Sequence, residues 1–482
     1  MQSLFSRSKP GTKGYSLPKR DVPEAPPLPD AYRRKRPANL PELAEPEVVR
    51  HFTNLSRLNY SVDSHFYPLG SCTMKYNPKF AEKIAAREEF TALHPLLPQL
   101  MGGGMLTQGA LEILYNLEQS LSEICGMDAF TTHPMAGAHG ELTGIMLIAA
   151  YFRNKGIKKK YVLIPDSGHG TNPASAAIAG FQVKTIPSDA SGMMDMKAYK
   201  EALSGEVAAI MLTCPDTLGN FYPHIKEITD LLHEAGGLAY YDGANLNAIL
   251  GKARPGDLGF DVVHVNLHKT FATPHGGGGP GAGPVGVKKE LIPFLPVSRI
   301  RKREDGTFAL HYDEPLSVGY MAPFYGNFLV LLRAYAYILL LGRNGLIEAG
   351  EHAVLNANYL LACLKDSYKP GAAYPLGCMH EFVVSPVKQM EHGVHAIDIA
   401  KALLDRGFYA PTVYFPLIVK EAIMIEPTET ETKATLDSFI AAMRDIAELA
   451  EKNPEAFADM PVTTPVTRLD EVKAARDMDI AD

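Results

Sequence analysis

The sequence predicts an α/β protein with a mostly parallel sheet, followed by a smaller α+β domain. Short apolar runs that end in polar or glycine-containing loops lie at 160–170, 207–219, 237–247 and 261–270. Uniformly apolar runs separated by helical stretches, such as 225–237, are typical of parallel strands buried on both faces. After about residue 300 long helices and shorter strands predominate, which predicts the second domain.

Apolar periodicity predicts the helices around these runs. Phe328–Leu341 is the longest apolar stretch, and because Arg333 interrupts it we expect a core helix and no membrane span. Helices are expected at 107–126, 140–156 and 432–452, one or two long helices at 326–365, and a short strand at 380–386.

These patterns divide the chain into four predicted parts. Residues 1–50 are rich in proline and predict an arm without a core of its own. The predicted parts are an extended N-terminal arm (1–90), a large α/β domain that binds a cofactor (91–300), a small C-terminal α+β domain (301–458) and an extended tail (459–482).

The composition is that of an ordinary globular protein. The chain has 482 residues, a formal net charge of -7 and 46% hydrophobic residues, which argues against a nucleic-acid partner. Five cysteines without C-x-x-C spacing favour a reducing compartment, so we expect a cytoplasmic location. The basic first twenty residues faintly resemble a transit peptide, but Pro10, Gly11 and Gly14 favour a surface arm.

Polar residues with chemical potential follow the predicted strands. His169, Asp242 and Lys269 each lie where a strand should end, and in open α/β sheets ligands bind beyond the carboxyl ends of the strands. Taken singly, each has a simpler explanation: an exposed loop histidine, a helix N-cap, and a lysine paired with a carboxylate.

A predicted helix that begins near residue 140 follows Ala136, Gly137, Ala138 and His139. Free N–H groups at a helix N-terminus, with small side chains beside them, can bind a phosphate group. A plain turn of small residues is the alternative.

Together these groups are more specific than any one of them. A phosphate site, then His169, Asp242 and Lys269 is the order that pyridoxal 5'-phosphate chemistry requires. The lysine holds the aldehyde as a Schiff base, and the aspartate keeps the pyridine nitrogen protonated. His169 can lie flat against the ring, and the small Ala244 can cover its opposite face.

Six motifs resemble the glycine cleavage system P-protein family, glycine dehydrogenase (decarboxylating). The match runs in order from about residue 45 to the tail. The chain has about half the length of a single-chain P-protein and carries the lysine, so it resembles subunit 2 of the two-subunit bacterial form. The motifs are FYPLGSCTMKYNPK, AGAHGELTG, YYDGANLNAI, DVVHVNLHKTFATPHGGGGPG, FYGNF and PTVYFPLIVKEAIMIEPTETE.

The resemblance implies fold type I of the pyridoxal-phosphate enzymes, the aspartate-aminotransferase type. It implies catalytic roles for three residues: Lys269 as the Schiff-base lysine, Asp242 as partner of the pyridine nitrogen, and His169 stacked on the ring. It places Ala136–Ala138 and His268 around the phosphate.

The implied reaction is decarboxylation of glycine with transfer of the aminomethyl group to the lipoyl arm of the H-protein, releasing carbon dioxide. Lys269 or His268 can move protons. The implied partners are the homologous subunit 1, in an α2β2 heterotetramer, and the lipoylated H-protein; no membrane partner is expected. The glycine-rich run at 276–283 either lines a channel for the lipoyl arm or forms a tight turn.

The sequence departs from the family at LTCPDTLGNF. The family usually has Asn-Pro-Asn-Thr-Leu-Gly there, and in related enzymes the first asparagine bonds the phenolic oxygen of the cofactor. Cys214 and Asp216 replace the two asparagines. Because a thiol is a weak donor, we expect either that Thr213 or Thr217 supplies this contact or that the electronics of the cofactor differ from those in the family.

Two other functions remain open on the residues alone: a pyridoxal-phosphate enzyme of another specificity, and a non-catalytic scaffold subunit. Lys269 and Asp242 argue against the scaffold. A P-loop NTPase is excluded because G-x-x-x-x-G-K-[ST] is missing, and no H-E-x-x-H motif or cysteine cluster predicts a metal site. Cys72 lies either near the lipoyl disulfide or in the core as a structural thiol.

Overall fold

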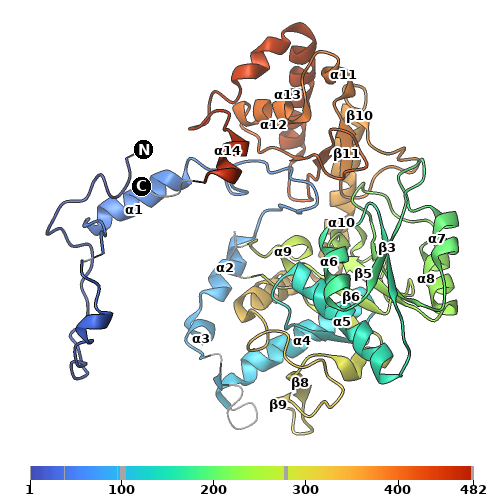
Figure 1. Cartoon of the computed structure of the whole chain (residues 1–482), viewed down its shortest axis with the longest axis horizontal. Helices are drawn as coiled ribbons and strands as arrows, with labels where there is room; N and C mark the ends of the chain where they lie inside the picture. The colour runs from blue at the N-terminus through green and yellow to red at the C-terminus, as the bar shows by residue number, and fades with distance from the viewer. Residues whose placement is uncertain (1, 37, 95, 98–104, 276–280, 479–482) are drawn as a thin grey trace. The chain divides into compact units, whose positions relative to one another are not determined.

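The structure is a computed structural model that describes residues 2–36, 38–94, 96–97, 105–275 and 281–478. Residue contacts group the chain into two compact units, Met1–Ser61 with Asp459–Asp482, and Val62–Ala458. In the first unit the elements are a 3-10 helix at Asp30–Tyr32, α1 (Glu45–Ser56) and α14 (Glu471–Arg476) (Figure 1). None of these elements buries a residue.

A seven-stranded sheet forms the centre of the second unit (Figure 1). Four neighbouring pairs, from β6 to β3 across the sheet, are parallel, and β7 is antiparallel to both β1 and β6. This confirms the predicted mostly parallel sheet. The strands in spatial order are β1 (Ala129–Thr131), β7 (Val285–Val287), β6 (Val262–Val265), β5 (Leu238–Gly243), β4 (Val207–Thr213), β2 (Tyr161–Pro165) and β3 (Gln182–Ile186).

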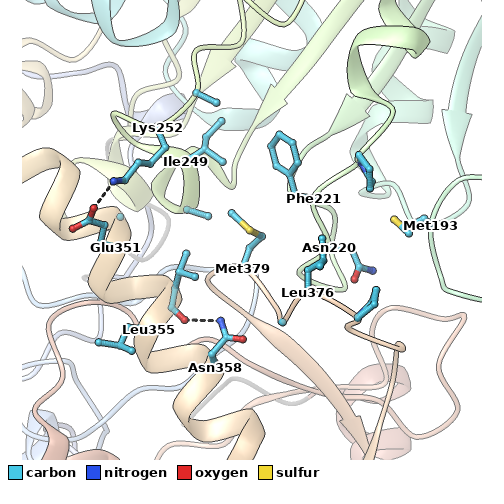
Figure 2. A pocket seen from close by; sticks show the side chains of 17 residues that line it. Met193, Asn220, Phe221, Ile249, Lys252, Glu351, Leu355, Asn358, Leu376 and Met379 are labelled. Carbon is cyan, nitrogen blue, oxygen red and sulfur yellow. Dashed lines mark hydrogen bonds and ion pairs between the residues drawn. The ribbon is translucent and has the colours of Figure 1, made fainter.

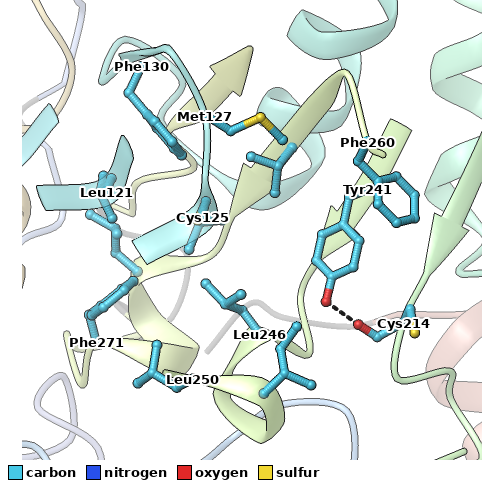
Figure 3. Packing of buried hydrophobic residues seen from close by; sticks show 14 of the residues in the cluster. Leu121, Cys125, Met127, Phe130, Cys214, Tyr241, Leu246, Leu250, Phe260 and Phe271 are labelled. Atoms are coloured by element: carbon cyan, nitrogen blue, oxygen red, sulfur yellow. Dashed lines mark hydrogen bonds between the residues drawn. The ribbon is translucent and has the colours of Figure 1, made fainter. Parts of the chain in front are cut away.

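Both faces of this sheet are buried, and its central strands are apolar at nearly every position. All seven residues of β4 are buried. Alternate residues enter two separate cores: Tyr241 and Val263 pack with Leu121 and Phe271 in one (Figure 3), whereas Tyr240 enters the other. Continuous apolar runs are therefore the pattern that this two-sided burial requires.

The helices agree with the predicted ones to within a few residues. The helix predicted at 107–126 is α4, which Gly126 ends in the left-handed conformation with φ 68°. Thr432 caps α13, accepting a hydrogen bond from Thr435 N. The helices of this unit are α2 (Lys79–Ala85), α3 (Glu88–Thr91), α4 (Gln108–Cys125), α5 (Gly137–Asn154), α6 (Thr171–Ile178), α7 (Met196–Ala202), α8 (Ile225–Glu234), α9 (Leu267–Thr270), α10 (Phe328–Leu364), α11 (Val387–Met390), α12 (Ala396–Asp405) and α13 (Lys433–Lys452), with 3-10 helices at Met105–Thr107, Leu246–Ile249, Lys289–Phe294 and Pro454–Asp459.

Helix α10 resolves the prediction of one or two long helices as two segments that meet at Gly342, whose φ of 57° is not helical. Within the described ranges it is also the one helix that is long and apolar enough to cross a membrane. Leu331 and Ala334 are fully buried in the core beside the large sheet, and Arg333 pairs with Glu82 at 2.8 Å. These contacts are those of a core helix.

A second, four-stranded antiparallel sheet lies in the C-terminal part of this unit. Its order is β10 (Lys369–Pro370), β11 (Phe382–Ser385), β13 (Ile423–Ile425) and β12 (Thr412–Val413). Phe382 pairs with Ile425 in the register of β11 and β13. Helix α12 contacts β12 of this sheet, and α13 packs against α12 (Figure 1).

The four-part domain division stays a prediction, and the structure corrects two of its details. The boundary at 300 cuts through β8 (Arg299–Lys302), which forms a hairpin with β9 (Phe308–His311). The segment 1–90, predicted as an extended arm, contains the helices α1 and α2 as well as most of α3 up to residue 90.

Candidate active site

Eight of the nine predicted cofactor residues line one cavity of about 280 Å³, close to the lower end of the usual range of roughly 300–1,000 Å³ for small-molecule sites. The ninth, Ala136, is the N-cap residue of α5, directly before the lining residue Gly137. The lining residues are Ser71, Cys72, Gly137, Ala138, Glu141, His169, Thr171, Thr213, Thr217, Asp242, Ala244, Asn245, Asn266, His268, Lys269 and His275.

Asp242 lies at one end of this cavity, on β5, and is 1% exposed. Sheet register places it between Thr213 of β4 and His264 of β6. Its carboxylate accepts hydrogen bonds from Ala244 N at 3.0 Å and Thr213 Oγ1 at 3.3 Å, and His264 Nε2 lies 3.5 Å away. Burial by itself raises the pKa of Asp242, but His264, the Ala244 N–H and Lys269 outweigh burial and hold the pKa below its ordinary value. Asp242 is therefore a buried, ionised carboxylate.

Lys269 belongs to the single-turn helix α9 that follows β6. Its Nζ donates a hydrogen bond to the carbonyl oxygen of Ser71 at 2.7 Å. Ser71 lies 198 positions away in the sequence. The lysine thus stands at the carboxyl end of the sheet with its amine facing the cavity.

The N-terminus of α5 forms the side of the cavity predicted to bind phosphate. The helix begins at Gly137, three residues before the predicted start at 140. A Cβ on Gly137 would lie 2.4 Å from Asn266 Oδ1, a buried oxygen without a hydrogen-bond partner among the described residues. A larger residue at this position would force the side chain of Asn266 or the start of α5 to shift. N–H groups at a helix start beside small residues, a buried carboxylate and a lysine amine fit pyridoxal phosphate.

His169 is exposed at the edge of the cavity. Its Nδ1 is 2.6 Å from Thr171 Oγ1, which donates to Glu141 Oε2 at 2.6 Å. Its ring meets that of Phe415 edge-on, with centroids 6.5 Å apart. Stacking of His169 on a cofactor ring stays a prediction, as does the cover of the opposite face by Ala244.

Burial keeps several groups in the cavity neutral. It raises the pKa of Glu141 to about 8, with Asp242 adding to the effect, and it lowers the pKa of His268 to about 3. Burial also raises the pKa of the Cys72 thiol to about 11, although Lys269 opposes this. Cys72 lines the cavity as a thiol and not as a thiolate, so it is a poor nucleophile at neutral pH.

Neither of the residues that depart from the family motif lines the cavity. Cys214 is fully buried in the core, and its carbonyl oxygen accepts a hydrogen bond from the Tyr241 hydroxyl (Figure 3). Asp216 caps a tight turn by accepting hydrogen bonds from Leu218 N and Asn220 N, each at 2.9 Å. Thr213 and Thr217 do line it, as expected of the residues that would replace the asparagine.

A larger cavity, of about 770 Å³, lies elsewhere and is mostly apolar. Figure 2 shows Phe221, Ile249 and Met379 around it, with an ion pair between Lys252 and Glu351 at its edge. It contains none of the predicted site residues. Size alone therefore does not identify the reactive site, and the convergent titratable groups do.

Sequence reasoning missed six polar residues of the cavity or its wall. Their signal was present, because each is a polar residue inside or next to a motif already singled out. They escaped notice because only the tertiary contacts show which polar side chains turn inward. They are Ser71, Glu141, Thr171, Asn245, Asn266 and His275. The glycine-rich segment was expected to line a channel or form a turn, and its residues 276–280 lie outside the described residues.

Comparison with known families gives two matches in sequence order. The family described as "Glycine cleavage system P-protein" matches residues 19–307, and "Glycine dehydrogenase, C-terminal domain" matches 349–461. A probable glycine dehydrogenase (decarboxylating) subunit 2 of Caldanaerobacter subterraneus subsp. tengcongensis is 57% identical over 98% of this chain and 97% of its own. The protein of the same description from Listeria monocytogenes serotype 4b is 56% identical over 99% and 97%.

Solved structures show the same fold. A glycine decarboxylase (P-protein) of the glycine cleavage system, in inhibitor-bound form, superposes with a TM-score of 0.71 at 23% identity, covering 87% of this chain and 93% of the other. A NifS-like protein superposes with a TM-score of 0.60 at 16% identity, covering 80% of this chain and all of the other. These likenesses confirm fold type I. Because the family models match residues 19–307 and 349–461, and because relatives above 55% identity align over nearly their full length, the chain belongs to the glycine cleavage system P-protein family.

Proposed function

We propose that this chain binds pyridoxal 5'-phosphate through Lys269 and decarboxylates glycine as subunit 2 of a two-subunit P-protein. The observation that carries the proposal is the convergence of Lys269, Asp242 and the N-terminus of α5 on one cavity. The names of the full-length relatives, glycine dehydrogenase (decarboxylating) subunit 2, support the same activity. In the overall reaction glycine loses carbon dioxide, and its aminomethyl group passes to one sulfur of a lipoyl disulfide while the other sulfur takes a proton.

The bound cofactor supplies an aldehyde for a covalent bond to an amine and a protonated ring that withdraws electrons from the substrate. Asp242 suits the ring nitrogen because it is ionised and buried. Gly137 and Ala138 would offer N–H groups to the phosphate. Thr213, which donates a hydrogen bond to Asp242, would contact the ring oxygen.

Lys269 and two groups near it can hold or move a proton. Neutral His268 can accept one at a ring nitrogen, and the Glu141 carboxyl, with its raised pKa, holds one near neutral pH. The amine of Lys269 itself can take up a proton when it is not bound to the cofactor. Among the described residues no arginine lines this cavity.

The first test is the absorption spectrum of the purified chain with pyridoxal phosphate, followed by borohydride reduction and peptide mapping. We expect a yellow band that reduction abolishes, with the label on Lys269. Lys269→Arg should abolish the label, whereas Lys252→Arg, a change of a surface lysine paired with Glu351, should not. A chain that takes up no cofactor, even with subunit 1 added, would favour a scaffold role.

The proposals for the transfer step and for the assembly rest on the resemblance of this chain to the P-protein family. We infer that the acceptor is the lipoyl arm of the H-protein and that the homologous subunit 1 completes an α2β2 heterotetramer. Release of labelled carbon dioxide from carboxyl-labelled glycine should require lipoylated H-protein. Release that needs no H-protein, or another product from glycine, would indicate a different specificity.

The cytoplasm is the proposed location. All five cysteines are free in the structure, which supports a reducing compartment. Fractionation of cells that produce the chain, with antibody detection, tests this location directly.

A further inference from the structure

The segment Ser71–Thr73 crosses the cavity at Lys269 in a conformation that needs support. Ser71 has a φ of 62° and Thr73 one of 48°, in the left-handed region that non-glycine residues seldom occupy. The carbonyl oxygen of Ser71 accepts the hydrogen bond from Lys269 Nζ. Backbone strain of this kind persists only where the surrounding structure fixes it.

Two buried glutamates hold this segment. Glu381 Oε2 accepts a hydrogen bond from Ser71 N at 2.6 Å. Glu426 accepts two from Thr73, from the backbone N at 2.7 Å and from Oγ1 at 2.5 Å. Both glutamates are 0% exposed.

The two glutamates are neighbours because of the second sheet. Phe382 pairs with Ile425, so Glu381 and Glu426 stand opposite each other one position beyond that pair. Two like charges placed opposite each other and buried destabilise a sheet unless something compensates them. Compensation must come from a proton or a cation.

His380 supplies the third member of this cluster. It is fully buried, and its Nε2 lies 3.8 Å from Oε1 of both Glu381 and Glu426. Neither of its ring nitrogens has a hydrogen-bond partner among the described residues. Burial lowers the pKa of His380 to about 3, and burial with the nearby Glu426 raises the pKa of Glu381 well above its ordinary value. The carboxyl pair therefore keeps a proton, and His380 stays neutral beside it.

A metal ion is the competing explanation, since the three side chains offer ligand atoms within 4.8 Å of one another. Both oxygens of Glu426 and one of Glu381 already accept hydrogen bonds of 2.5–2.7 Å from Ser71 and Thr73. This leaves few lone pairs for a cation, so the hydrogen bonds favour a proton.

We propose that Glu381, Glu426 and His380 are positioning residues that hold Ser71–Thr73 over Lys269 and so fix the orientation of its amine. The effect of the cluster on the reaction rests on the proposed function, whereas its effect on the contact between Ser71 and Lys269 does not. No member of the cluster lines the cavity itself. The cluster acts through the backbone of Ser71, and Glu381 Oε1 also accepts a hydrogen bond at 3.4 Å from Asn245 Nδ2, a lining residue.

Two substitutions separate this role from general stability. Glu426→Gln cannot accept both hydrogen bonds from Thr73, because one of its carboxylate oxygens becomes an NH₂ group. Glu381→Gln can still accept from Ser71 N with its remaining oxygen, while its NH₂ group replaces Oε1, which faces His380 and accepts a long hydrogen bond from Asn245. Ser385→Ala is the matched control, because it removes a partly buried hydrogen bond to Lys420 O from β11, the strand that directly follows Glu381.

The first readout is competitive acetylation of the full-length apo chain with trace acetic anhydride, quantified by peptide mass spectrometry. Loss of the Ser71 contact should raise the labelling of Lys269, relative to the other lysines, roughly ten-fold in Glu426→Gln. Glu381→Gln and Ser385→Ala should stay near wild type. Thr73→Val, which removes only the Oγ1 hydrogen bond, should follow Glu426→Gln in direction, and Thr73→Ser should restore protection.

The second readout is circular dichroism in the visible band of the holoenzyme, together with the melting temperature and metal content. Glu426→Gln should change the signal per bound cofactor, whereas Ser385→Ala should change only the melting temperature. Wild-type labelling of Lys269 in both Glu426→Gln and Thr73→Val, or one tightly bound divalent metal per chain, would overturn the proposal. If wild type bound no cofactor, the proposed function would fail, while the acetylation of Lys269 would still decide this inference.

Discussion

Replacing Gly137 with alanine tests how closely the start of α5 approaches the cofactor site. Two effects on the free energy of unfolding oppose each other. Alanine in place of glycine stabilises a helix by up to about 1 kcal/mol. The new methyl group would lie 2.4 Å from Oδ1 and 2.8 Å from Nδ2 of Asn266, and overpacking of this kind costs about 1–3 kcal/mol. We expect a net loss of stability between zero and about 2 kcal/mol.

The effect on cofactor affinity should be larger and in one direction. Gly137 and Asn266 both line the cavity, and Asn266 immediately precedes α9, which carries Lys269. Displacing Asn266 or the first turn of α5 moves the N–H groups predicted to bind phosphate. We expect pyridoxal phosphate to bind at least about ten-fold more weakly, equivalent to about 1.4 kcal/mol.

Urea unfolding of the apo chain measures the first effect, and spectrophotometric titration with pyridoxal phosphate the second. Gly109→Ala is the control, because it is exposed on α4 and its new Cβ would meet nothing within 4 Å. It should raise stability slightly and leave affinity unchanged. If Gly137→Ala bound the cofactor within about two-fold of wild type, the close-approach argument would be wrong.

Three further predictions follow from the polar groups of the cavity. Burial, with Asp242, raises the pKa of Glu141 to about 8, so the folded chain keeps a proton that the unfolded chain has already lost. The free energy of unfolding should therefore fall as the pH rises from about 5 to about 8. Urea unfolding across this range should show a shallower fall in Glu141→Gln; equal slopes would contradict the shift. Thr213→Val should lower turnover roughly ten-fold, because it removes the hydrogen bond to Asp242. Cys214→Ala should instead lower stability and leave the KM for glycine near wild type. Normal turnover in Thr213→Val with a changed KM in Cys214→Ala would refute the assignment of the cavity wall. Cys72→Ser should keep glycine turnover with the lipoyl carrier, and loss of turnover would instead indicate a catalytic role for this thiol. Wild-type Cys72 should react slowly with iodoacetamide at pH 7, because burial raises its pKa to about 11.

Local patterns in the sequence were sufficient for the fold class and for the order of the reactive groups. The apolar run of β4 predicts a strand buried on both faces, and all seven of its residues are buried. The periodic segment 107–126 predicts α4 to within a residue at each end, and Gly126 ends it. Lys269 and Asp242 were identifiable because a charged residue at the end of an apolar strand needs a partner or a ligand.

Register between distant strands decided the rest. The sequence cannot show that β6, β5 and β4 lie side by side, yet this order brings Asp242 between Thr213 and His264. Nor can it show that Cys214 turns into the core while Thr213 faces the cavity, since that depends on where β4 ends.

The contacts of Ser71 with Lys269 and Glu381, across 198 and 310 positions, are of the same kind. Hydrophobic periodicity is a local property and fixes the elements. The contacts that complete the site arise only when two sheets, far apart in the sequence, bring their ends together around the Ser71–Thr73 segment.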